Sequence, residues 1–124
     1  DISSVVLYGE IYGSKVQGKQ FCYGKNLGEY GFVAFDLRIN YQFKNYDDFV
    51  SIMDKYGIPR VPLVYQGKFD YDKILELTNG NSLMCSSEQI REGLVIKPII
   101  EKISPVLGRL ILKIISNEFN LKRK

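Results

Sequence analysis

Two strand-like segments near the end of this chain carry charge where apolar residues would be expected. Residues 92–98 read EGLVIKP, and residues 110–116 read LILKIIS. Alternation places Lys113 between Ile111 and Ile115 on one face of its strand, and an unpaired charge buried there would be costly. Such a lysine either extends to solvent at an edge or pairs with an anion.

Strand-forming runs also occupy the first third of the chain. Residues 5–12 and 32–39 are rich in β-branched and aromatic side chains, which favours strands. A tight turn near Asn40 is expected to return the chain through residues 41–43. The antiparallel hairpin this implies is the first half of an α+β arrangement.

Helical spacing replaces alternation after residue 45. Phe49, Ile52 and Met53 share one face of a helix predicted over 45–56, with Tyr56 one turn further on. Asn45 or Asp47 can cap its start, and Gly57 marks its end.

A second, shorter helix is expected from Asp70 to about residue 79. Tyr71, Ile74 and Leu75 share one of its faces. We find no repeat or linker, and 124 residues suit one ordinary domain. The fold class predicted is therefore α+β, with antiparallel sheets and flanking helices.

Composition excludes several functions. The chain has no histidine and only Cys22 and Cys85, so it cannot assemble a four-ligand zinc site alone. Two free thiols and a disulfide both stay open. The net charge of +3 is too small to indicate nucleic-acid binding. No run of about 20 apolar residues and no signal peptide is present, so we expect an intracellular, cytoplasmic protein, with the nucleus left open.

Four short segments stand out, namely GEIYG at 9–13, FVAFD at 32–36, EGLVIK at 92–97 and LKIIS at 112–116. Their order and rough spacing resemble those of the last four nucleotidyltransferase motifs of RNA ligases. The chain thus resembles the carboxyl-terminal part of an ATP-dependent RNA ligase, in the superfamily that includes DNA ligases and mRNA capping enzymes. The resemblance implies a partial ligase-type nucleotidyltransferase domain over residues 1–124.

The resemblance assigns roles in binding the nucleoside of ATP. Glu10 would accept charge-assisted hydrogen bonds from the ribose hydroxyls; its alternative is an ordinary surface carboxylate. Phe35 would stack on the adenine. Alternation alone groups Phe35 with Val33 and Leu37 and favours a place in the core.

The resemblance also assigns roles at the phosphates. Glu92 matches a carboxylate that holds Mg²⁺ or Mn²⁺, and its alternative is a charge at a loop-to-strand boundary. Lys113 would contact the α-phosphate and stabilise charge as pyrophosphate leaves. Lys97 would be a second phosphate contact.

The implied reaction has three nucleotidyl transfers. A lysine attacks the α-phosphate of ATP and forms lysyl-AMP, AMP passes to an RNA 5′-phosphate, and an RNA 3′-hydroxyl then displaces AMP. Positioning and charge neutralisation would supply most of the catalysis. The partners are RNA ends, in particular those of a nicked duplex.

The nucleophile of this family lies in a Lys-x-Asp-Gly or Lys-x-Glu-Gly motif, and neither tetrapeptide occurs in this chain. We therefore expect the chain to be inactive alone and interpret it as lacking the upstream part of the same protein, through cleavage, truncation or a two-chain assembly. The alternatives are a fragment of a DNA ligase or capping guanylyltransferase, and a non-catalytic module that binds nucleotide or RNA.

Overall fold

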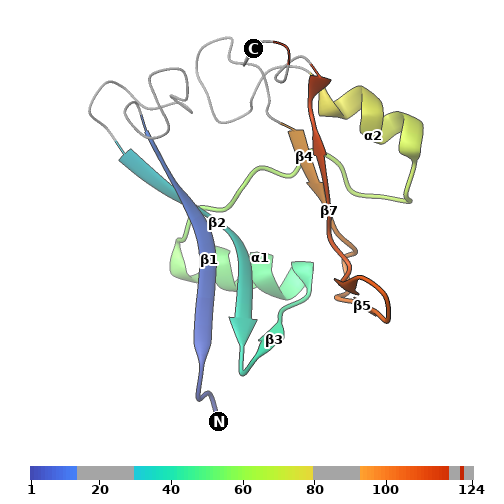
Figure 1. Cartoon of the computed structure of the whole chain (residues 1–124). Helices are drawn as coiled ribbons and strands as arrows, with labels where there is room; N and C mark the ends of the chain where they lie inside the picture. Colours follow the sequence, from blue (N-terminus) through green and yellow to red (C-terminus); the bar gives the residue numbers. More distant parts are fainter. Residues whose placement is uncertain (14–29, 80–92, 118–120, 122–124) are drawn as a thin grey trace. The chain divides into compact units, whose positions relative to one another are not determined.

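The computed structural model describes residues 1–13, 30–79, 93–117 and 121, and it has the α+β class expected (Figure 1). Cys22, Cys85, Glu92 and the last three residues lie outside the described part. Along the chain the elements are β1 (Val5–Gly13), β2 (Tyr30–Ile39), β3 (Gln42–Phe43), α1 (Tyr46–Tyr56), α2 (Tyr71–Thr78), β4 (Gly93–Ile96), β5 (Ile103–Ser104), β6 (Gly108–Arg109) and β7 (Leu112–Ile115).

The chain divides into two compact units, although its sequence shows no linker between them. The first unit contains Asp1–Ile11, Gly31–Val61 and Lys97–Ile111, and the second contains Tyr12–Tyr30, Pro62–Ile96 and Leu112–Lys124. Each unit is assembled from three separate stretches of sequence, so the contacts that join these stretches are long-range.

The first unit contains a sheet with strand order β1-β2-β3. The predicted turn is present, because Asn40 and Tyr41 both adopt positive φ and β3 then pairs antiparallel with β2. Asn40 also joins β2 to the start of β1, since its Oδ1 accepts hydrogen bonds from the backbone N–H groups of Ser3 and Ser4 at 2.8 and 3.1 Å.

Helix α1 supplies most of the core of the first unit. Phe49 and Met53 are buried as the helical spacing predicts, and they pack with Ala34 and Leu37 of β2. Tyr56 is exposed although it continues the same spacing. The helix ends at Gly57, which is left-handed and donates to carbonyls of the last turn.

The segment 97–101 is bound to the start of α1. The Tyr46 N–H donates to the carbonyl of Ile99 at 2.9 Å. The Asn45 side chain, expected to cap the helix, makes no cap hydrogen bond; its Oδ1 accepts instead from the N–H of Glu101 at 2.8 Å. Asn45 therefore fixes a distant segment of chain, and the short β5–β6 hairpin follows this anchor.

The second unit pairs β4 with β7 in an antiparallel ladder, in which Val95 lies opposite Lys113. Helix α2 contacts β4, and Asp70 caps its start, because the Asp70 side chain accepts a hydrogen bond from the N–H of Lys73. Of the face predicted to be apolar, Ile74 is buried, whereas Tyr71 and Leu75 are exposed. Among the described residues of this unit, β4, β7 and α2 leave part of that apolar face uncovered.

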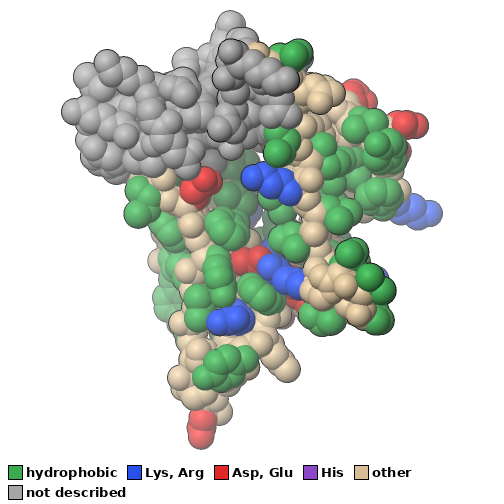
Figure 2. Space-filling view, in the orientation of Figure 1, with side chains coloured by type: hydrophobic (Ala, Val, Ile, Leu, Met, Phe, Trp, Pro, Cys, Tyr) green, Lys and Arg blue, Asp and Glu red, His purple; other side chains and the backbone are tan. Residues whose placement is uncertain are grey.

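Hydrophobic side chains also lie on the surface of the molecule (Figure 2). In the first unit they include Val5, Leu7 and Ile11 of β1, and Val106 and Leu107 between β5 and β6. Within the described residues nothing covers these side chains. No helix in the described ranges is long and apolar enough to cross a bilayer.

Gly93 is required where β4 meets β7, because a Cβ there would lie 2.0 Å from the Ile114 carbonyl oxygen. Backbone cannot move aside as a flexible side chain can. We therefore expect Gly93→Ala to lower the free energy of unfolding by about 1–3 kcal/mol in urea titrations.

Gly108→Ala is the matched control, because Gly108 has a positive φ and open space around its missing Cβ. Gly108→Ala should lower the free energy of unfolding by only about 1 kcal/mol. A Gly93→Ala chain as stable as the unsubstituted one would contradict the close approach of β4 and β7.

Candidate functional site

Phe35 is exposed in the middle of an otherwise buried stretch of β2. Its exposed fraction is 41%, whereas Val33, Ala34, Asp36 and Leu37 are all buried. Alternation favoured a core position for Phe35, and that expectation is wrong. Because β2 has buried residues on both faces, alternation could not assign the burial of any single side chain in it.

The strand carrying Phe35 is fixed through its backbone. The N–H of Ala34 donates to the carbonyl of Pro59 at 2.8 Å, and the N–H of Val61 donates to the carbonyl of Ala34 at 2.9 Å. This isolated parallel bridge occupies the edge of β2 just before Phe35. The strand that carries the aromatic ring is therefore anchored by these hydrogen bonds, while the ring itself is exposed and available for contact.

The next residue, Asp36, is a buried carboxylate with two cationic partners. Its exposed fraction is 2%. Lys97 Nζ donates to Oδ1 at 3.2 Å, and Arg109 Nη1 lies 2.7 Å from Oδ2. A carboxylate removed from water needs compensation of this kind, and each of its oxygens has its own cation.

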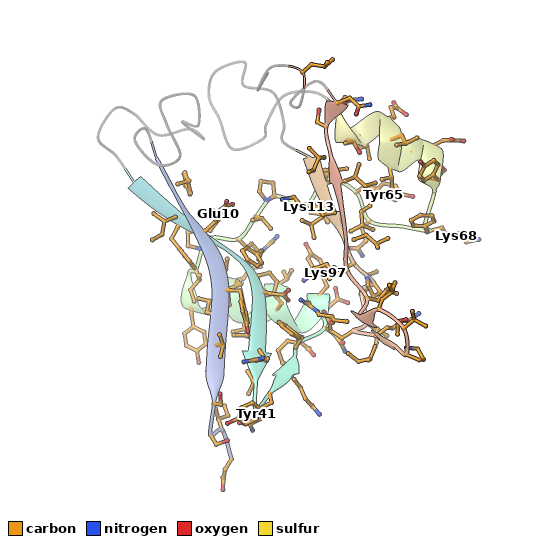
Figure 3. The ribbon with its side chains drawn as sticks, in the orientation of Figure 1. Glu10, Tyr41, Tyr65, Lys68, Lys97 and Lys113 are labelled. Atoms are coloured by element: carbon orange, nitrogen blue, oxygen red, sulfur yellow. The ribbon has the colours of Figure 1, made fainter. Side chains whose placement is uncertain are left out.

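Lys97, expected at a phosphate, is bound to β2 in this structure. Besides Asp36, its ammonium reaches the carbonyl oxygen of Phe35 at 3.4 Å and lies 5.5 Å from the centroid of the Phe49 ring. Figure 3 shows Lys97 directly after β4. Its role toward phosphate stays a prediction, and its role toward Asp36 is what the geometry adds.

Sequence reasoning missed Arg109 and Glu101. The Nη2 and Nε atoms of Arg109 donate to the two carboxylate oxygens of Glu101 at 2.6 and 2.9 Å. The guanidinium also lies 3.7 Å from the centroid of the Phe43 ring. The signal available in the sequence was Asp36, because a carboxylate between buried strand residues requires a cation from elsewhere in the chain.

These contacts raise the pKa of Arg109 above its usual value, chiefly through the hydrogen bond to Glu101 and further through Asp36, while burial acts in the opposite sense. Arginine is protonated at any ordinary pH in any case. The positive charge beside Asp36 is therefore permanent.

Glu10 is exposed on β1, the strand next to β2 (Figure 3). The two strands run antiparallel, because Asn40 hydrogen-bonds to Ser4 while Gly9 lies against Phe32 and Val33. A Cβ on Gly9 would meet the Phe32 ring at 2.2 Å. The glycine of this motif therefore allows a phenylalanine from β2 to cover the backbone beside Glu10.

Lys113 is exposed on β7 in the second unit (Figure 3). Ile111 and Ile115 beside it and Val95 opposite it are exposed as well. Among the described residues Lys113 has no ion-pair partner. Of the two alternatives that the sequence left open for this lysine, extension to solvent is the one observed, so its ammonium is accessible to an external anion.

The structure thus brings Glu10, Phe35 and Lys97 into one unit and places Lys113 in the other. Glu92, the predicted metal ligand, lies outside the described residues. What the first unit offers is an exposed aromatic ring on a fixed strand and an exposed carboxylate on the adjacent strand. These groups are suited to a flat base and to hydroxyl groups, respectively.

Comparison with known proteins agrees with this reading. The model of the RNA ligase family matches residues 1–115. Two solved variants of Naegleria gruberi RNA ligase, both with AMP and Mn, share 25% identity with this chain at TM-scores of 0.73 and 0.74. The matches cover 95% and 96% of this chain and 34% of each ligase chain. No curated protein matches it.

The chain therefore spans about a third of the length of these ligase structures and corresponds to part of their fold. The family match over residues 1–115 leads to one assignment. The chain belongs to the RNA ligase family.

Proposed function

We propose that this chain forms the nucleotide-binding part of an ATP-dependent RNA ligase whose nucleophilic lysine lies in an upstream part of the same protein. The observation that carries the proposal is the exposed ring of Phe35 on a strand whose neighbouring positions are buried. A phenylalanine that served only the core would be buried with them. AMP in the two similar ligases supports a nucleotide as its ligand.

Phe35 and Glu10 are the residues proposed to bind the nucleoside. The Phe35 ring stacks on the adenine, and stacking of this kind needs no hydrogen bond and excludes water from the base. Glu10, which lies on the adjacent strand β1, accepts hydrogen bonds from the ribose hydroxyls. Together they fix the nucleoside so that its α-phosphate can be attacked in line.

Lys113 is proposed to contact the α-phosphate. Its exposed ammonium is a compact charge that can neutralise the oxygen atoms as pyrophosphate leaves. Lys97 is proposed as a second phosphate contact, in exchange for part of its bonding to Asp36. Arg109 would then remain as the counterion of that carboxylate.

Glu92 is proposed to hold Mg²⁺ or Mn²⁺, and Mn in the similar ligases supports a metal of this class. Such an ion supplies charge neutralisation at the phosphates when it is bound. The evidence for Glu92 is its position in the sequence pattern of residues 92–97.

The full-length ligase is proposed to join an RNA 3′-hydroxyl to a 5′-phosphate, with the ends of a nicked duplex as substrate. Its first step would transfer AMP to the upstream lysine. Since no Lys-x-Asp-Gly or Lys-x-Glu-Gly sequence occurs in residues 1–124, the chain alone has no nucleophile for this step.

Autoadenylylation with labelled ATP tests whether the nucleophile for this step lies outside residues 1–124. The full-length protein should acquire covalent AMP, detected by intact mass, and residues 1–124 alone should acquire none. Covalent AMP on the isolated chain would contradict the proposal. ATP binding by a full-length protein that never becomes labelled would favour the non-catalytic module, and sealing of nicked DNA in preference to nicked RNA would favour a DNA ligase.

Phe35→Ala in the full-length ligase should weaken binding of AMP by about 1–3 kcal/mol, roughly 5- to 150-fold in Kd, because the base loses its stacking surface. Isothermal titration calorimetry measures this directly. Phe69→Ala is the matched control, since Phe69 is also exposed but lies in the second unit. Equal Kd values for the Phe35→Ala and unsubstituted proteins would contradict stacking.

Lys113→Ala should slow autoadenylylation roughly 10- to 150-fold, the loss expected for a charge-assisted contact of about 1.5–3 kcal/mol. The melting temperature should not change, because the side chain is exposed and has no ion-pair partner in the described residues. Lys73→Ala, an exposed lysine on α2, is the control. An unchanged rate in Lys113→Ala would remove Lys113 from the phosphate site.

A further inference from the structure

Arg109 connects separate parts of the first unit through one side chain. It belongs to β6, and its guanidinium contacts Asp36 of β2, Phe43 of β3 and Glu101 in the segment before β5. None of the four ligase-like sequence segments includes Arg109 or Glu101. Neither residue therefore belongs to the four segments that resemble RNA ligase motifs.

The contacts of Arg109 use the planar geometry of the guanidinium. Nε and Nη2 form a two-pronged bond to both oxygens of Glu101, while Nη1 is directed to Oδ2 of Asp36 at 2.7 Å. The flat face of the guanidinium lies over the Phe43 ring, 3.7 Å from its centroid. A lysine could supply the charge here but not the fork or the stacking plane.

Arg109 is the tighter of the two partners of Asp36. Its Nη1 lies 2.7 Å from one oxygen, whereas Lys97 Nζ lies 3.2 Å from the other and divides its bonding with the Phe35 carbonyl. Both side chains are mostly buried, Arg109 with 17% and Lys97 with 15% exposed. The shorter distance therefore gives Arg109 the larger share in fixing where the Asp36 carboxylate lies.

The position of Asp36 affects Phe35 because the two residues are consecutive in one strand. Successive side chains of a strand point to opposite faces. Pinning the Asp36 carboxylate on one face of β2 therefore helps to orient the exposed Phe35 ring on the other. The bridge at Ala34 fixes the strand one residue earlier, so residues 34–36 are held from both sides.

We propose that Arg109 is a positioning residue for nucleotide binding: through Asp36 it holds Phe35 in the orientation that stacks on a purine base. This inference rests on the proposed function, because the stacking role of Phe35 is itself proposed. Its new content is that base recognition depends on an arginine that touches neither the nucleotide nor its phosphates.

The test uses Arg109→Lys and Arg109→Ala in the full-length ligase, with two probes in calorimetry. AMP carries the base, and inorganic tripolyphosphate carries phosphates alone. We expect Arg109→Lys, which keeps the charge, to weaken AMP binding roughly tenfold, because small misplacements of positioning groups have effects of this size. Tripolyphosphate binding should change less than about twofold.

Lys55→Ala is the control, because Lys55 is an exposed cation on α1 of the same unit, away from β2 and Asp36 in the sequence. It should leave both affinities unchanged. Should Arg109→Ala fail to fold, Arg109→Lys still decides the matter, since it retains a cation beside Asp36.

A double-mutant cycle with Phe35→Ala separates this inference from the proposed function. If Arg109 acts through Phe35, then Arg109→Lys has no further effect on AMP affinity once the ring is gone. Additive losses, or equal losses for AMP and tripolyphosphate, would overturn the positioning role alone. Full AMP affinity in Phe35→Ala would overturn the stacking role and this inference with it.

Discussion

The buried carboxylate of Asp36, with Lys97 on one oxygen and Arg109 on the other, is the interaction on which the first unit depends. A charge at 2% exposure has lost its water and must be compensated by the protein. Removing one member of such a group generally costs about 3–5 kcal/mol, since the remaining charge is left buried and unpaired. Asp36 lies 61 residues before Lys97 in the sequence and farther still from Arg109, so the interaction forms only when the chain is folded.

This constraint also explains the chemistry available at the surface. The same strand that buries Asp36 exposes Phe35, and Lys97 bonds to both residues. A stacking surface is effective when its ring is already oriented, because ordering it on binding would reduce affinity. The ionic cluster and the exposed ring thus belong to the same strand, β2. By holding that strand in place, the cluster keeps the ring oriented for binding.

Periodicity in the sequence predicted β1, β2, α1 and the start of α2, because strands and helices of this length show their pattern locally. The order of four short segments predicted the family, which the match over residues 1–115 confirms. Long-range contacts were beyond such reasoning. Asn45 binds Glu101 instead of capping its own helix, and Arg109 completes the pairing of Asp36.

Burial was the other quantity that local pattern could not give. Phe35 was grouped with core residues and is exposed, and Lys113 was placed among apolar neighbours that are themselves exposed. Burial depends on what covers a strand, and the covering elements come from elsewhere in the sequence. Glu92 lies outside the described residues, so its role as a metal ligand stays a prediction.

The exposed ring of Phe35 is the surface that we propose receives the base of the nucleotide. A crystal structure of the full-length ligase with AMP tests this most directly. We expect the adenine stacked on Phe35, the ribose hydroxyls bonded to Glu10, and Asp36 still paired with Arg109. Adenine bound at another surface, or Phe35 covered by protein in the AMP complex, would contradict it.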